Sequence, residues 1–204
     1  MSLWPEIVLI LTAYIIGSIP FGYIFTKEFT GKSILELGSG NIGSTNVGRI
    51  AGNKLAVLTQ ICDMSKGLLP VAVVYFLQIK NLHHFEEYYI YLVALATILG
   101  HDFSVFLKMK GGKGVNTTLG ASLLLAPYSV LLSVMIYFAV KWKYKIVSLG
   151  SIVLAISLTI TELVIHKVSF SFYYLLTCSV LIIIRHIPNI KRLLIGTENH
   201  SKDK

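Results

Sequence analysis

Charge is scarce in this chain of 204 residues, because Asp, Glu, Lys and Arg make up only 14% of it, against about 25% in an ordinary soluble domain. Hydrophobic residues make up 54%, and the mean hydropathy is +0.72. This composition excludes a soluble globule, and it excludes a disordered chain because disorder requires low hydrophobicity. Cysteine is limited to Cys62 and Cys178. Both lie in apolar runs, which indicates buried thiols and excludes a disulfide framework.

The sequence contains several long apolar runs. Runs at about residues 3–25, 55–79, 88–107, 115–140, 146–165 and 168–184 approach or exceed the roughly 20 residues that a bilayer-spanning helix needs. The first run lacks the basic start and the small-residue cleavage site of a secretory signal, so we expect it to stay in the mature protein. The sequence therefore predicts an all-α integral membrane protein, with residues 1–204 as a single polytopic membrane domain.

Basic residues predict the orientation of the chain. A net charge of +8 would suit a nucleic-acid partner, but on so apolar a chain it is more typical of loops beside an anionic membrane face. Most basic residues fall in four stretches: Lys27, Lys32, Arg49 and Lys54; Lys108, Lys110 and Lys113; Lys141, Lys143 and Lys145; and Arg185, Lys191, Arg192, Lys202 and Lys204. By the positive-inside rule these stretches and the C-terminus are cytoplasmic, and the N-terminus lies outside.

The run at residues 115–140 then has cytoplasmic loops at both ends, so it must cross the membrane twice or not at all. We expect a bend at Ala126-Pro127, because proline removes a backbone donor and disfavours helix in the residue before it. The two arms are short for full spans. The first is expected to be tucked inside the bundle, where the protein satisfies its polar Asn116, Thr117 and Thr118. The prediction is seven transmembrane helical segments.

Three cytoplasmic segments, at about residues 27–54, 108–118 and 185–204, are the predicted active-site segments. The first contains Gly38-Ser39-Gly40-Asn41-Ile42-Gly43-Ser44-Thr45-Asn46-Val47-Gly48-Arg49. Glycines let backbone amides turn toward an anion, hydroxyls and amides add donors, and an arginine clamps phosphate. The glycines fit a dinucleotide-binding pattern, but that pattern requires a parallel sheet and these flanks are membrane helices. The alternative is a flexible polar linker.

The second segment joins Gly100-His101-Asp102-Phe103 to Lys108-Met109-Lys110-Gly111-Gly112-Lys113-Gly114-Val115-Asn116-Thr117-Thr118. Bare glycine amides, a lysine and a helix N-terminus together suit a phosphate group. The segment is not a Walker loop, because Leu107 and Gly114 stand where that motif needs Gly and Ser or Thr. The alternative is a basic turn with glycine caps. A lone histidine such as His101 is more often structural than a base.

The third segment is Arg185-His186-Ile187-Pro188-Asn189-Ile190-Lys191-Arg192-Leu193-Leu194-Ile195-Gly196-Thr197-Glu198. The spacing places His186, Asn189 and Arg192 on one face if a helix includes all three. Such a face could hold an anion and move a proton. The alternative is an ordinary basic tail on the membrane surface.

Charged residues inside the apolar runs need partners, because each costs about 2.5–3.5 kcal/mol at mid-membrane. Asp63 and Lys66 are three residues apart on the second run and are expected to pair. Whether they support the site or only lock helices together stays open at this point. Glu162 has no partner nearby in the sequence, and its role is not predicted.

Taken together, Gly38 to Arg49, Asp63-x-x-Lys66-Gly67, Gly100-His101 with residues 110–115, and Asn189-x-x-Arg192 to Glu198 closely resemble the bacterial acyl-phosphate:glycerol-3-phosphate acyltransferases, the PlsY family. The resemblance extends from Gly17 to Glu198. It implies a seven-helix enzyme of the cytoplasmic (inner) membrane with these blocks facing the cytoplasm. The implied reaction joins a long-chain acyl phosphate to the 1-hydroxyl of glycerol 3-phosphate and gives lysophosphatidic acid and inorganic phosphate, in phospholipid synthesis. Ile42 and Ser104 depart from the family by standing where proline is expected.

The resemblance also implies residue roles. The catalytic set is Ser39, Arg49, Lys113, His186 and Asn189. Substrate binding falls to Gly38, Gly40, Asn41, Thr45, Asn46, His101, Lys110, Gly111, Gly112, Gly114, Thr118 and Arg192, and structural support to Asp63, Lys66 and Glu198. His186 is the candidate base, with a substrate phosphate as the rival proton acceptor.

Acidic residues number only ten and form no cluster at ligand spacing, so neither a metal nor a cofactor is predicted. The expected partners are the two substrates and membrane lipid, without nucleic acid and without an obligate protein partner. A transporter for an anionic metabolite is the alternative from another class, and it would need polar residues continuing through the membrane. A metal-dependent phosphotransferase would need clustered carboxylates.

Overall fold

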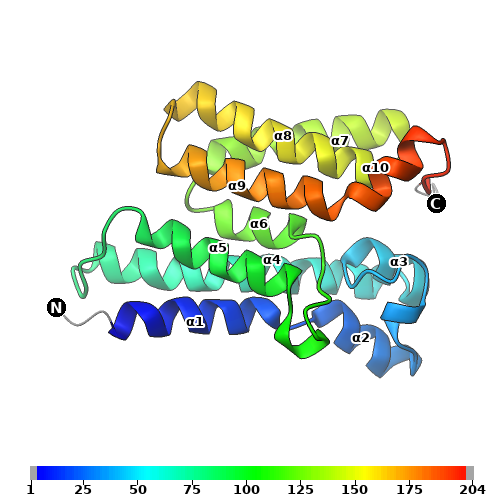
Figure 1. Cartoon of the computed structure of the whole chain (residues 1–204), viewed down its shortest axis with the longest axis horizontal. Helices are drawn as coiled ribbons and strands as arrows, with labels where there is room; N and C mark the ends of the chain where they lie inside the picture. The colour runs from blue at the N-terminus through cyan, green and yellow to red at the C-terminus, as the bar shows by residue number, and fades with distance from the viewer. Residues whose placement is uncertain (1–3, 201–204) are drawn as a thin grey trace. The chain divides into compact units, whose positions relative to one another are not determined.

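The computed structural model describes residues 4–200, and within that range it is all-helical. Its α-helices are α1 (Trp4–Ser18), α2 (Phe21–Thr30), α3 (Ser44–Ala51), α4 (Asn53–Ile79), α5 (Tyr89–Asp102), α6 (Val115–Ser122), α7 (Pro127–Tyr144), α8 (Val147–His166), α9 (Phe170–Arg185) and α10 (Ile187–Leu194) (Figure 1). Two 3₁₀ turns, η1 (Ile34–Glu36) and η2 (Val105–Leu107), lie in loops. Lys202 and Lys204, assigned above to the cytoplasm, lie outside the described residues.

The chain divides into two compact units, Met1–Leu124 and Leu125–Lys204. In the first unit α4 contacts α1, α2, α3, α5 and α6, and α1 also lies along α5 (Figure 1). The backbones of α4 and α6 approach closely. A side chain at Gly67 would strike the carbonyl of Thr117, and one at Gly120 would strike that of Met64. Glycine at these two positions therefore sets the helix separation.

A break separates α1 from α2, which the sequence predicted as one run. Pro20 stands at this break and has no N–H to donate to the helix. From the second helix of the run the chain enters the polar loop before α3. Beneath that loop lies a small core of Ile34, Ile42, Val47 and Leu107. Ile42, noted above as a departure from the family pattern, is thus a core side chain, 1% exposed.

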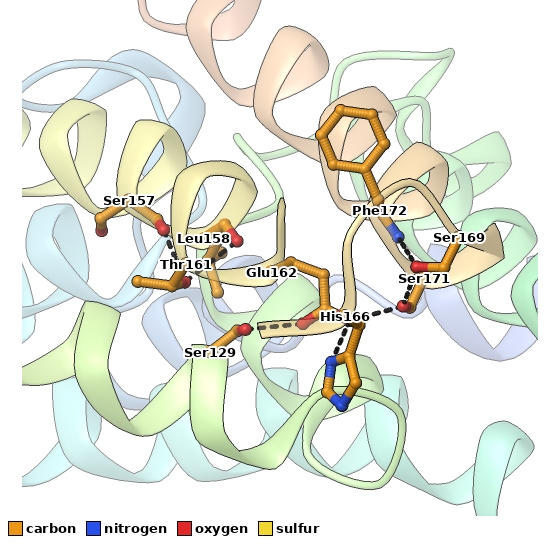
Figure 2. A network of polar contacts seen from close by, with 9 residues as sticks. All are labelled: Ser129, Ser157, Leu158, Thr161, Glu162, His166, Ser169, Ser171 and Phe172. Atoms are coloured by element: carbon orange, nitrogen blue, oxygen red, sulfur yellow. Dashed lines mark hydrogen bonds and ion pairs between the residues drawn. The ribbon is translucent and has the colours of Figure 1, made fainter. Parts of the chain in front are cut away.

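In the second unit α8 lies between α7 and α9, and α10 continues from α9 after a bend of 59° (Figure 1). Glu162 is fully buried near the end of α8 and accepts hydrogen bonds from Ser129, at 2.6 Å, and from Ser171. His166 Nδ1 lies 2.9 Å from Glu162 Oε1, the oxygen that also accepts from Ser171 (Figure 2). The partners that the sequence did not reveal for Glu162 therefore come from α7, from α9 and from the next turn of its own helix.

Helix length and composition support membrane embedding. Within residues 4–200, four stretches are long and apolar enough to cross a bilayer, namely Trp4–Thr30, Asn53–Ile79, Tyr89–Leu107 and Val147–His166, and a fifth is added if α9 and α10 form one bent span. The expected interruption of the run at 115–140 is confirmed, because α6 ends at Ser122 and α7 begins at Pro127. Seven spans and the side of each terminus stay predictions.

Candidate active site

Asn46 organises the first polar loop from inside. Its side chain is 2% exposed, its amide nitrogen donates to the carbonyls of Leu37 and Asn41 at 3.0 Å, and its amide oxygen accepts from the N–H of Ser39 at 3.1 Å. A side chain at Gly38, where φ is +59°, would collide with that amide. The loop shape is thus fixed by one buried side chain, and Asn46, predicted to bind substrate, is committed to the protein itself.

Around this buried support the loop presents its polar groups outward. Ser39, Thr45 and Arg49 are exposed, and Arg49 lies in the last turn of α3. The side chain of Asn41 caps the turn by accepting from the N–H of Gly43 at 2.8 Å. A hydroxyl on an ordered loop and a guanidinium on the helix that follows it suit a phosphate-bearing ligand.

The glycine-rich second loop is fastened to the end of α5. The N–H of Gly111 donates to the carbonyl of Asp102 at 3.2 Å, and that of Gly112 donates to the carbonyl of His101 at 2.9 Å. The bare amides that the sequence predicts for a phosphate are therefore not these two. Lys113 is half-buried, and Gly114 immediately precedes α6 as its N-cap, with a φ of +74°.

The first and second loops meet in the first unit. Asn116 donates to the hydroxyl of Ser44 at 3.2 Å, which joins the start of α6 to the start of α3. Lys110 is exposed, whereas Thr117 and Thr118 are fully buried and their hydroxyls have no hydrogen-bond partner among the described residues. The structure therefore brings Ser39, Arg49 and the lysine loop onto neighbouring elements, and it places Thr118 inside the protein.

Beneath the second loop lies the predicted ion pair. Lys66 Nζ is 2.9 Å from Asp63 Oδ1, and both side chains are 2% exposed. The pairing expected from the sequence is confirmed. Asp63 Oδ1 also lies 3.7 Å from Nδ1 of His101, which is buried at the end of α5.

Glu198 is the hub of the third segment, in the second unit. It accepts hydrogen bonds from Asn189 at 2.7 Å, from Arg192 at 2.6 Å and from Ser148 at 2.9 Å. Burial by itself would raise the pKa of Glu198, but the three donors and the charge of Arg192 outweigh it and hold the pKa below its ordinary value. Asn189 and Arg192 lie on α10 and both reach Glu198, but His186, which was predicted to share their face, lies just outside this helix.

His186 stands at the junction of α9 and α10 and is 3% exposed. Its Nδ1 lies 2.8 Å from the carbonyl oxygen of Ile182. Because a carbonyl only accepts, this contact places the hydrogen on Nδ1, and in the neutral ring the lone pair is then on Nε2. That tautomer is the one a general base at Nε2 requires.

Two supporting residues escaped the sequence-based prediction. Ser148 reaches Glu198 from fifty positions earlier in the chain. Ser104, identified above only as a departure from the family pattern, is fully buried and donates to the carbonyl of Ser18 at 2.5 Å. No local pattern signals either contact, because each joins segments far apart in sequence.

Bilayer-length apolar helices that carry a Ser-Arg loop and a Gly-Lys loop define an integral membrane protein with an anion-suited polar site. Within residues 4–200, no three His, Cys, Asp or Glu side chains lie close enough to hold a metal ion.

Comparison with known proteins identifies the family. Residues 7–196 match the family described as glycerol-3-phosphate acyltransferase. The glycerol-3-phosphate acyltransferase of Clostridium acetobutylicum is 40% identical over 194 residues, covering 94% of this chain and 98% of the relative. That of Geotalea daltonii is 41% identical over 196 residues, covering 95% and 96%. The crystal structure of PlsY (YgiH), an integral membrane glycerol 3-phosphate acyltransferase in its glycerol 3-phosphate form, superposes with a TM-score of 0.88 at 34% identity, covering 97% of this chain and 96% of that one.

The chain belongs to the glycerol-3-phosphate acyltransferase family. It is accordingly a membrane-embedded acyltransferase of phospholipid biosynthesis that uses glycerol 3-phosphate. The family predicted from the four sequence blocks is confirmed.

Proposed function

We propose that the protein transfers a long-chain acyl group from acyl phosphate to the 1-hydroxyl of glycerol 3-phosphate. The hydroxyl oxygen bonds to the acyl carbonyl carbon, and the bond from that carbon to the phosphate oxygen breaks. The products are 1-acylglycerol 3-phosphate and inorganic phosphate. The observation that supports this proposal is the contact of Asn116 with Ser44, which joins the segment that bears the exposed Ser39 and Arg49 to the segment that bears Lys113.

Charge explains why these residues suit that reaction. Both substrates carry phosphate, and negative charge also develops on the carbonyl oxygen in the transition state. We assign Arg49 and Lys113 to neutralising this charge and Ser39 and Asn189 to orienting substrate. Among the residues predicted to bind substrate, Lys110, Thr45 and Arg192 keep polar groups near the surface. In this proposal the reaction needs no cofactor.

The proton of the attacking hydroxyl needs an acceptor. His186 fits through the lone pair on Nε2 that its contact with Ile182 implies. A substrate phosphate oxygen is the competing acceptor. A variant His186→Gln separates the two, because it retains a hydrogen-bonding side chain and removes the base. Loss of the pH dependence of kcat assigns the proton to His186, and an unchanged profile assigns it to the substrate.

Orientation in the membrane belongs to the same proposal. Seven helical segments, with the N-terminus outside and the C-terminus inside, would place residues 27–54, 108–118 and 185–204 at the cytoplasmic face of the inner membrane, where a water-soluble phosphate meets an acyl chain. The basic stretches support this orientation. Single cysteines placed at Lys80 and at Lys110 test it, since a membrane-impermeant thiol reagent added outside should label the first and not the second.

The reaction itself is tested by measuring phosphate release by the purified protein in lipid, with palmitoyl phosphate and with or without glycerol 3-phosphate. We expect release that depends on glycerol 3-phosphate and yields lysophosphatidic acid. Arg49→Ala and Lys113→Ala should each lower the rate by about 100-fold or more. Lys80→Ala is the matched control, because Lys80 is an exposed lysine at the end of α4, outside the site. Binding of glycerol 3-phosphate without any acylated product would instead favour the transporter.

A further inference from the structure

An ion pair within a membrane helix is unusual enough to need a reason. Asp63 and Lys66 lie in α4, one of the stretches long enough to span the bilayer, and are nearly inaccessible. A buried ion pair often stabilises a protein no better than apolar side chains of the same size. It does hold its partners in a defined geometry. The groups that this pair contacts therefore indicate what it is for.

On one side the pair contacts the backbone at the break between α1 and α2. Lys66 Nζ donates to the carbonyl of Ile19 at 2.8 Å, and its ammonium lies 5.7 Å from the centre of the Phe21 ring. The carbonyl of Ile19 belongs to the turn that Pro20 creates. Lys66 thus ties α4 to a fixed point on the first helical run.

On the other side the pair faces His101. The imidazole is 4% exposed, and its Nδ1 lies 3.7 Å from Asp63 Oδ1. The opposite edge of the ring faces the glycine loop, because a Cβ built on Gly112 would fall 2.0 Å from His101 Nε2. The carbonyl of His101 meanwhile holds the N–H of Gly112. One residue therefore contacts the ion pair with one ring edge and the loop with the other.

We propose that Asp63, Lys66 and His101 are positioning residues that hold the loop of residues 111–114, through Gly112, in the shape that binds the phosphate of glycerol 3-phosphate. This proposal rests on the proposed function. The sequence predicted that His101 contacts the substrate directly. In this proposal His101 instead supports the loop from beneath. The proposal also assigns the ion pair to the site, the question that the sequence left open.

Steady-state kinetics distinguish positioning from general stability. For His101→Ala we expect KM for glycerol 3-phosphate to rise about tenfold, while kcat and the KM for palmitoyl phosphate change little. His101→Gln, which restores a polar side chain able to reach Asp63, should recover most of the affinity. Glu162→Gln is the matched control, because Glu162 is an equally buried carboxylate in the second unit. It should leave the KM for glycerol 3-phosphate unchanged.

A double-mutant cycle tests the contact itself. Gly112→Ala should raise the same KM strongly, because the new methyl group collides with the imidazole. In the His101→Ala background the imidazole no longer occupies that space. The factor by which Gly112→Ala raises the KM for glycerol 3-phosphate should therefore be smaller by about fivefold or more. Strict additivity would overturn the proposal, and so would a loss confined to kcat.

Direct binding of glycerol 3-phosphate, measured by titration calorimetry, keeps this proposal separate from the proposed function. If the wild type binds glycerol 3-phosphate without acylating it, the acyltransferase reaction fails. The positioning role is then still decided by whether His101→Ala weakens binding. A wild type that neither binds nor acylates overturns both proposals. Variants that bind normally yet melt early would show that the ion pair serves stability alone.

Discussion

Asp63 in the first unit and Glu162 in the second are both buried carboxylates, and their partners differ. In the first unit Asp63 is paired with the ammonium of Lys66 at 2.9 Å. In the second, Glu162 contacts the hydroxyls of Ser129 and Ser171 and the imidazole of His166 (Figure 2). Removing one partner of an ion pair leaves the other charge buried and unpaired, whereas removing a hydroxyl donor removes only a hydrogen bond. We therefore expect the loss of Lys66 to destabilise the protein more than the loss of a hydroxyl partner of Glu162.

Lys66→Met should have the largest effect on stability. It strands the carboxylate of Asp63 in an apolar helix, and we expect a loss of about 3–5 kcal/mol, measured as the free energy of unfolding in detergent. Replacing the pair together, as Asp63→Leu with Lys66→Met, should recover much of that loss because no charge is left. If the positioning role is correct, the recovered double variant still has a raised KM for glycerol 3-phosphate. A double variant as unstable as the single one would contradict the comparison.

Glu162→Gln should cost less, at about 2 kcal/mol, because the amide keeps the size of the side chain and leaves no unpaired charge. The loss comes from weaker hydrogen bonds with Ser129 and Ser171. Thermal unfolding of Glu162→Gln and Lys66→Met, measured in parallel, compares the two stability losses directly. Equal losses would mean that leaving a buried charge unpaired costs no more than weakening the hydrogen bonds of Glu162, which contradicts the expected order.

Glu198 is a buried carboxylate outside the candidate spans, so Glu198→Gln can be studied as a function of pH. The pKa of Glu198 lies below its ordinary value of 4.5 in the folded protein. Its ionised form therefore adds stability that is present above that value and is lost as the pH falls through the folded-state pKa. Near neutral pH we expect the free energy of unfolding of the wild type to exceed that of the variant by about 1.5 kcal/mol. The gap should narrow below about pH 4.5, as unfolding curves from neutral to acidic pH would show. A gap independent of pH would exclude this carboxylate as its source.

Ser104 provides the smallest expected effect. Its hydroxyl donates to the carbonyl of Ser18, so Ser104→Ala should cost about 1 kcal/mol. Its backbone, with φ −64° and ψ 122°, is already in the range of proline. Ser104→Pro should consequently cost less than Ser104→Ala, because the restricted unfolded chain offsets part of the lost hydrogen bond. Parallel unfolding of the two variants checks this order. A proline variant less stable than the alanine variant would contradict it.

Sequence reasoning succeeded where the signal was local. The pairing of Asp63 with Lys66 and the common face of Asn189 and Arg192 follow from helical spacing. The interruption before Pro127 follows from the chemistry of one residue. The same reasoning missed the break at Pro20, because hydropathy is continuous through residues 3–25.

Contacts between distant segments could not be read in the same way. Asn46 looks like any polar loop residue, yet it holds three backbone groups of its loop. The amides of Gly111 and Gly112 look available for phosphate, yet both donate to the end of α5. In each case the sequence pattern indicates which polar groups are present, but only the packing of the chain shows which groups they bind.

Hydropathy and motif chemistry were enough to predict the membrane character, the positions of the three polar segments and the family, because both depend on residues close together in the chain. The partner of each buried polar group depends instead on how the helices pack. Glu162 meets Ser129 from 33 positions away, and Lys66 meets the carbonyl of Ile19 from 47. Burial makes such partners obligatory, and the approach of helices far apart in the chain decides which ones they are.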